Sequence, residues 1–122
     1  MLKAEFPLEV GADLLEADWA RACGEISSAS RVPWILLSAA VDYDTYLRQV
    51  RVACQAGACG CAAGRAVWQE AVGLTGQERT TFLKEVARPR LETLASLCAE
   101  FGRPWTDFFS PDEITSDWYK TY

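Results

Sequence analysis

The sequence lacks histidine entirely, and its five cysteines include no paired C-x-x-C units. Zinc sites usually combine such cysteine pairs with each other or with histidine, so we expect no metal site. The cysteines are odd in number and irregularly spaced, at Cys23, Cys54, Cys59, Cys61 and Cys98. We interpret them as buried free thiols of a protein in the reducing cytoplasm.

Long apolar runs and an excess of basic charge are also missing. No apolar run approaches the roughly 18 residues that suggest a membrane span, and residues 1–7 lack the apolar region of a signal peptide. The formal net charge of -5 argues against nucleic acid, because a phosphate backbone requires a basic surface. We therefore expect neither a membrane nor a nucleic-acid partner.

What the 122 residues do contain is an alternation of strand and helix patterns. Strands are predicted at residues 2–6, 34–38 and 59–63. The run Trp34–Ser38 is apolar without alternation, which is typical of a strand buried on both faces.

Helical spacing of apolar residues follows each strand. Helices are predicted over about residues 15–26, 42–56, 66–72 and 78–101. Asp42 is the expected N-cap of the second helix, and Gly57 is its expected C-terminal stop. Pro89 should split or kink the last helix, because proline lacks an amide donor and crowds the preceding turn.

The order strand–helix, repeated three times, predicts an α/β fold with a parallel sheet and right-handed crossovers. Three strands are too few for a closed barrel, and no glycine-rich fingerprint follows the first strand. We therefore expect a single partial domain, with β/α units in residues 1–103. The aromatic-rich residues 104–122 should pack as an irregular arm, since disordered tails are poor in aromatic residues.

Two predicted strands end in small residues suited to anion binding. Ser38, Ala39 and Ala40 follow one strand, and Gly64 and Arg65 follow the next. Small residues let backbone N–H groups approach an anion, a short helix would point its N-terminus at it, and arginine adds a charge-assisted contact. These features predict a phosphate site. The alternative is that the small residues only permit tight packing of helix on strand.

The first predicted strand carries Lys3 and Glu5. A lysine on the inner face of a barrel strand would be desolvated, which lowers its pKa and frees the amine to form a Schiff base with a ketone. Glu5 would then tune that pKa. The alternative is a solvated lysine near the start of the chain.

Three strand segments carry a family resemblance. Leu2–Pro7 (LKAEFP), Pro33–Asp42 (PWILLSAAVD) and Ala56–Trp68 (AGACGCAAGRAVW, with a G-R-A-x-W signature) resemble strands six, seven and eight of tagatose-1,6-bisphosphate aldolases and their relatives, including sulfofructose phosphate aldolases. The ending, Pro104–Thr106 and Asp117–Tyr119, is also similar. The resemblance covers nearly all of this chain but only about two-fifths of a family protein, whose (β/α)₈ barrel needs about 250 residues.

The resemblance implies a class I aldolase, which cleaves a ketose bisphosphate to dihydroxyacetone phosphate and an aldehyde without a metal or cofactor. Lys3 matches the Schiff-base lysine; Ser38, Ala39 and Ala40 match one half of the phosphate site, and Gly64 and Arg65 match the other. The family usually has glycine where Ala40 stands. Because strands one to five are absent, we expect a gene fragment or truncated reading frame.

Two other functions remain open. The chain is an inactive barrel remnant, or a half-barrel that pairs with itself or with a complementary N-terminal barrel portion, since open strand edges invite pairing. Alternatively, it belongs to another phosphate-binding barrel enzyme, such as a sugar-phosphate isomerase. The Lys3-x-Glu5 segment favours the aldolase over the isomerase.

Overall fold

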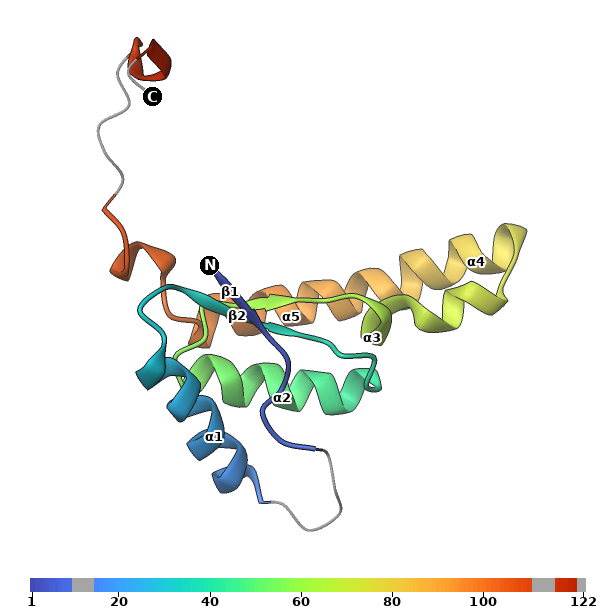
Figure 1. Cartoon of the computed structure of the whole chain (residues 1–122). Helices are drawn as coiled ribbons and strands as arrows, with labels where there is room; N and C mark the ends of the chain where they lie inside the picture. The colour runs from blue at the N-terminus through green and yellow to red at the C-terminus, as the bar shows by residue number, and fades with distance from the viewer. Residues whose placement is uncertain (10–14, 111–115, 121–122) are drawn as a thin grey trace.

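The computed structural model describes residues 1–9, 15–110 and 116–120. Three short strands form a parallel sheet in chain order: β1 (Leu2–Ala4), β2 (Trp34–Leu37) and β3 (Cys61–Ala62). The crossover helices α1 (Glu16–Ala29) and α2 (Tyr43–Gln55) lie on the same side of the strands (Figure 1). The predicted alternation of strands and helices and the parallel sheet are thus confirmed, although the chain is mostly helical.

After β3 the chain is helical almost throughout. The elements are α3 (Arg65–Trp68), the 3₁₀ turn η1 (Gln69–Gly73), α4 (Gly76–Phe82), the π-helical turn η2 (Leu83–Ala87) and α5 (Arg88–Phe101). Helix α2 lies between α1 and α5 and packs against both. No helix among the described residues is long and apolar enough to cross a membrane.

Strand β2 is buried on one face, and the prediction that it is buried on both is wrong. Trp34 and Leu36 are fully buried, whereas Ile35 and Leu37 are only half-buried. Lys3 pairs with Ile35 and Ala62 pairs with Leu37, so these four side chains lie on the same face of the sheet. We call Lys3, Ile35, Leu37 and Ala62 the open face. An apolar run allows a strand to be buried on both faces. It does not show that the described part of the chain provides side chains to cover both faces, and here only one face is covered.

One serine hydroxyl links the buried face of β2 to both of its helices, beside the packing of the core. Trp34 Nε1 donates to Ser27 Oγ over 2.9 Å, and Ser27 Oγ donates to the carbonyl of Ala56 over 2.5 Å. A Cβ added to Gly57, whose φ is +106°, would lie only 2.8 Å from Ser27 Oγ. Gly57 therefore ends α2 as predicted, and its missing side chain leaves room for the serine that joins β2, α1 and α2.

Pro89 interrupts the α-helical pattern without ending the helix. The π turn η2 ends at Ala87, two residues before Pro89, and the Arg88 N–H donates to the carbonyl of Leu83, five residues back. This wider turn accommodates a residue that has no N–H to donate. Helices α4 and α5 consequently continue as one long helical segment (Figure 1).

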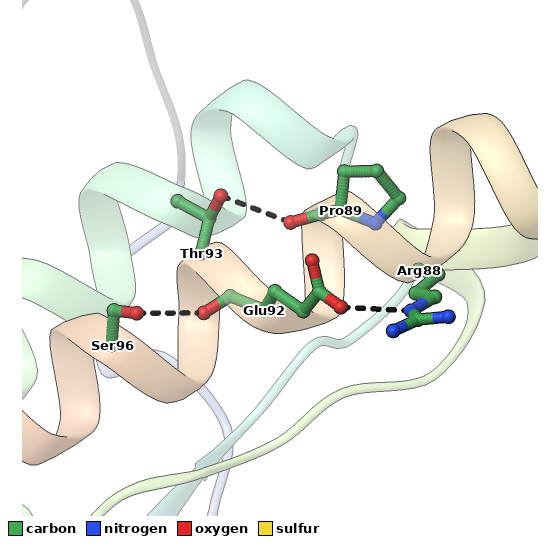
Figure 2. Close-up of polar contacts among 5 residues, drawn as sticks. All are labelled: Arg88, Pro89, Glu92, Thr93 and Ser96. Carbon is green, nitrogen blue, oxygen red and sulfur yellow. Dashed lines mark hydrogen bonds and ion pairs between the residues drawn. The ribbon is translucent and has the colours of Figure 1, made fainter.

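The polar side chains on the outer face of α5 contact groups of the same helix. The hydroxyls of Thr93 and Ser96 each donate to the carbonyl four residues earlier, at Pro89 and Glu92, over 3.0 Å (Figure 2). Arg88 Nε contacts Glu92 Oε1 over 2.8 Å. These groups are exposed and satisfied within the helix, so this face carries no candidate site.

The C-terminal arm contains the 3₁₀ turns η3 (Trp105–Asp107) and η4 (Trp118–Lys120). Its residues 111–115 and 121–122 lie outside the described residues. Trp105, Phe109 and Tyr119 are exposed, so the predicted packing of the arm is wrong for these three side chains. Aromatic composition alone does not supply a surface for such side chains to pack against.

The predicted N-cap of α2 is confirmed. Asp42 Oδ1 accepts the backbone N–H of Thr45 over 2.9 Å, and Oδ2 accepts the Thr45 hydroxyl over 2.7 Å. The hydrogen bond from the Thr45 N–H to the Asp42 carboxylate is the main cause that lowers the pKa of Asp42. We predict that Asp42→Ala lowers the free energy of unfolding by about 1 kcal/mol at pH 7, measured by urea denaturation.

The same cap gives a pH dependence with a defined sign. Because the folded-state pKa of Asp42 is depressed, its contribution is present above the unfolded-state pKa and is lost as pH falls through the folded value. The stability difference between wild type and Asp42→Asn should therefore shrink as pH falls below about 4. A difference that stays constant down to pH ~2 would mean that the charge of Asp42 does not contribute.

Candidate functional site

The carboxyl ends of β2 and β3 bring the predicted phosphate residues together. Ser38 follows β2 and is 8% exposed, and a Cβ added to Gly64 would lie only 3.6 Å from Ser38 Oγ. Arg65 begins α3 directly after Gly64 and is exposed. Among the described residues, none forms a hydrogen bond with the Ser38 hydroxyl, so this group is free for a ligand. Three residues predicted from two separate segments thus meet at one end of the sheet.

The turn between β2 and α2 has an unusual backbone. Ala39 and Ala40 have φ values of 43° and 62°, and the Val41 N–H donates to the Ser38 carbonyl over 3.2 Å. Two successive positive φ values spanned by such a bond are the pattern of a type I′ turn, which favours glycine, asparagine and aspartate. Each alanine in the left-handed region costs about 1–2 kcal/mol. Such strain persists where the surrounding structure fixes the turn, often beside a functional site.

This strain predicts the effect of restoring glycine. Ala40→Gly should raise the free energy of unfolding by about 1 kcal/mol, because glycine adopts a φ of 62° without steric cost. Ala95→Gly, on the exposed surface of α5, is the matched control and should lower it by about 1 kcal/mol. Urea denaturation measures both. If both variants lost stability, the left-handed turn would be excluded.

An open cavity of about 480 Å³ lies beside the turn, and Ala40 and Arg65 both line it. Its far wall carries Arg90, whose Nη1 contacts Glu70 Oε1 over 2.8 Å and the Val67 carbonyl over 3.0 Å. The Arg90 guanidinium also lies 4.8 Å from the centre of the Tyr43 ring. Arg90 Nη1 therefore joins α5 to η1 and α3 at the wall of the cavity.

Sequence reasoning missed Arg90 and Glu70. They stand in the last long helix and in the 3₁₀ turn η1, 20 residues apart, and no spacing pattern connects them. The pKa of Glu70 is lowered first by its own backbone N–H and then by Arg90. Glu70 is thus ionised at neutral pH and paired with Arg90.

The charges around the cavity restrict where an anion can bind. Among the described residues, no carboxylate lies within 4.0 Å of the Arg65 guanidinium. The carboxylates of Asp42, Asp44 and Glu70 line the same cavity and repel an anion. Among the residues that line the cavity, Arg65 is therefore the group that favours an anion, and Ser38 lies next to Gly64 outside that lining.

Lys3 lies on the same sheet but away from this group. It stands opposite Ile35 in β2, three residues before Ser38, which is about 10 Å along the strands at 3.3 Å per residue. The predicted desolvation of Lys3 is not found in this chain, because Lys3 is exposed on the open face. Glu5 is exposed too, and within the described residues it makes no ion pair with Lys3. The structure therefore confirms that Lys3 lies in a strand and shows it exposed; its predicted role as a nucleophile stays a prediction.

Comparison with known protein families neither supports nor contradicts the resemblance to the aldolases. No protein-family model matches the sequence. The resemblance to the aldolases therefore stays a prediction from the sequence segments around Lys3, Ser38 and Arg65 and from the ending of the chain.

Proposed function

We propose that this chain supplies the phosphate-binding part and the nucleophilic lysine of a class I aldolase built on a (β/α)₈ barrel. The observation that carries the proposal is the close approach of Gly64 to the Ser38 hydroxyl at the ends of adjacent parallel strands, with Arg65 directly after Gly64 and without an ion pair among the described residues. In such barrels, phosphate groups frequently bind at the loops after strands seven and eight beside a short extra helix. The short α3 follows Gly64 in the corresponding place.

The sheet itself supports a barrel over a doubly wound fold. Its strand order β1-β2-β3 follows the chain, whereas doubly wound sheets reverse direction at a switch point. The open face is mainly apolar, with Ile35, Leu37 and Ala62 around Lys3, as the inner surface of a barrel is. Further strands, from the same polypeptide or from a complementary chain, would cover this face.

Lys3 is the proposed nucleophile. Covering the open face would desolvate its side chain and favour the neutral amine. The amine adds to the ketone carbon of the substrate, and loss of water gives an imine. When the carbon–carbon bond breaks, its electron pair moves to the imine nitrogen, the aldehyde leaves, and protonation and hydrolysis release dihydroxyacetone phosphate. The base that accepts the substrate hydroxyl proton would come from the strands that complete the barrel.

The phosphate site fixes the substrate relative to the amine. Arg65 and Ser38 would hold the phosphate about 10 Å along the sheet from the Lys3 backbone, and the lysine side chain extends into that interval. Holding the ketone near the amine raises its effective concentration there. The five free thiols suit the reducing cytoplasm in which we expect this reaction to occur.

Borohydride reduction in the presence of dihydroxyacetone phosphate tests this function directly. Reduction converts an imine into a stable secondary amine, so peptide mass mapping shows which lysine formed it. An adduct on Lys3 supports the aldolase. No adduct, or an adduct only on other lysines, contradicts it.

The exposure of Lys3 favours a second function, that of an inactive barrel remnant or a half-barrel that needs a partner. The mass of the gene product in its source cells separates the two proposals. A product near the size of a full barrel supports the aldolase. A product of 13.5 kDa supports the remnant or half-barrel, and native mass measurement then shows whether it pairs with itself or with another chain.

A further inference from the structure

Three cysteines from three different elements meet between the sheet and the last helix. Cys54 lies on α2, Cys61 in β3 and Cys98 near the end of α5. The Sγ atoms of Cys61 and Cys98 are 3.7 Å apart. The proposed aldolase function uses none of these thiols, so what they do is a separate question.

Only two of the three thiols are accessible. Cys61 and Cys98 are half-buried and line a cavity of about 340 Å³ together with Leu91, Leu94 and Ala95. Cys54 is 2% exposed. A small uncharged molecule that enters this apolar cavity therefore meets Cys61 and Cys98 first.

The start of β3 passes close to Cys98, and the two sulfur atoms lie near each other. A Cβ added to Gly60, the residue before Cys61, would lie 3.9 Å from Cys98 Sγ, so the start of β3 passes directly by this side chain. A disulfide requires an S–S distance of about 2.05 Å, so the two sulfur atoms must approach by about 1.7 Å. Rotation of the two side chains provides movement of this size.

The three thiols also differ in acidity. Cys98 Sγ lies within hydrogen-bond distance of Cys61 Sγ, and its contacts with Cys54 and Cys61 lower the pKa of Cys98. The pKa values of Cys54 and Cys61 are raised, first by their hydrogen bonds with Cys98. Cys98 lines the cavity 3.7 Å from Cys61 Sγ, and because the thiolate is the reactive form, the direction of its pKa favours Cys98 over Cys61 as the nucleophile of this accessible pair.

We propose that Cys98 and Cys61 are a peroxide-reactive dithiol that closes to a disulfide between α5 and β3. The Cys98 thiolate attacks one oxygen of hydrogen peroxide; the O–O bond breaks, hydroxide leaves, and it takes up a proton to become water. The Cys61 sulfur then attacks the Cys98 sulfenic acid; the S–S bond forms, the S–O bond breaks, and a second water leaves with the Cys61 proton. Two thiols are oxidised and one peroxide is reduced to two waters.

The disulfide would link helix α5 to strand β3. This proposal does not depend on whether the chain binds a sugar phosphate. To test it, the full chain is treated with hydrogen peroxide, remaining thiols are alkylated, and peptides are mapped by mass. We expect a cross-linked Cys61–Cys98 peptide that is lighter by two hydrogen atoms. Two of the five thiols are consumed, so three remain for alkylation. Five remaining thiols, or a link between other cysteines, would overturn the proposal.

Single variants identify the role of each sulfur. Cys98→Ser should slow thiol loss at least ~10-fold, because the stabilised thiolate is gone. Cys61→Ser should leave a Cys98 sulfenic acid that dimedone traps. Cys59→Ser is the matched control, since Cys59 is also half-buried and lies two residues from Cys61; it should leave the cross-link unchanged. Loss of the cross-link in the Cys59 variant, or equal peroxide rates for wild type and Cys98→Ser, would contradict these roles.

Discussion

Lys3→Ala should abolish the borohydride-stable adduct that dihydroxyacetone phosphate forms at the start of the chain. The variant removes the only side-chain amine on the open face among the described residues, next to Ile35 and Leu37. The proposed phosphate site lies about 10 Å farther along the strands, so bound ketone is concentrated near this amine. Peptide mass mapping after reduction measures the adduct.

Lys84 provides the control for this experiment. It is exposed, like Lys3, but lies in the π turn η2. The wild-type chain should carry at least ~10-fold more adduct on Lys3 than on Lys84. The reason is that the rate of imine formation depends on how close the bound ketone lies to the amine, and both amines are exposed. Lys84→Ala should leave the Lys3 adduct unchanged. Equal labelling of the two lysines would remove the case for Lys3 as the nucleophile.

Arg65→Ala should weaken binding of inorganic phosphate by about 10- to 100-fold, because hydrogen bonds to a charged group contribute about 1.5–3 kcal/mol. Arg65 is exposed and has no carboxylate within 4.0 Å among the described residues, so folding should change by less than about 0.5 kcal/mol. Isothermal titration with phosphate and urea denaturation measure the two effects separately.

Arg88→Ala is the matched control for Arg65→Ala. Arg88 is also an exposed arginine at the start of a helix, but it pairs with Glu92 on the outer face of α5 (Figure 2). Its removal should change phosphate affinity by less than about 2-fold, since a surface ion pair is worth about 0–1 kcal/mol. The Arg65 variant should also carry less of the Lys3 adduct. If both arginine variants bound phosphate as well as wild type, the phosphate site would be wrong.

The sequence located the elements because local physics decides them. Asp42 caps α2 and Gly57 ends it. A helix start needs a side-chain acceptor and a helix end needs a residue with positive φ, and both needs are met by residues next to the helix in the sequence. Small residues at Ser38 and Gly64 likewise marked the strand ends, and the parallel sheet brings them together. The left-handed backbone at Ala40 was indicated only indirectly, because the family resemblance expects glycine at this position. The φ of 62° itself is known only from the structure.

The rest depended on contacts between distant segments. The pairing of Arg90 with Glu70 and the approach of Cys98 to Cys61 join residues 20 and 37 positions apart, and no periodicity in the sequence encodes either contact. Lys3 was assigned to a strand correctly, yet its exposure depends on what covers the open face. By itself the sequence determined the order of strands and helices and the residues at their ends. Only the tertiary structure decided which of those residues meet and which remain in solvent, because burial depends on surfaces brought from elsewhere in the chain.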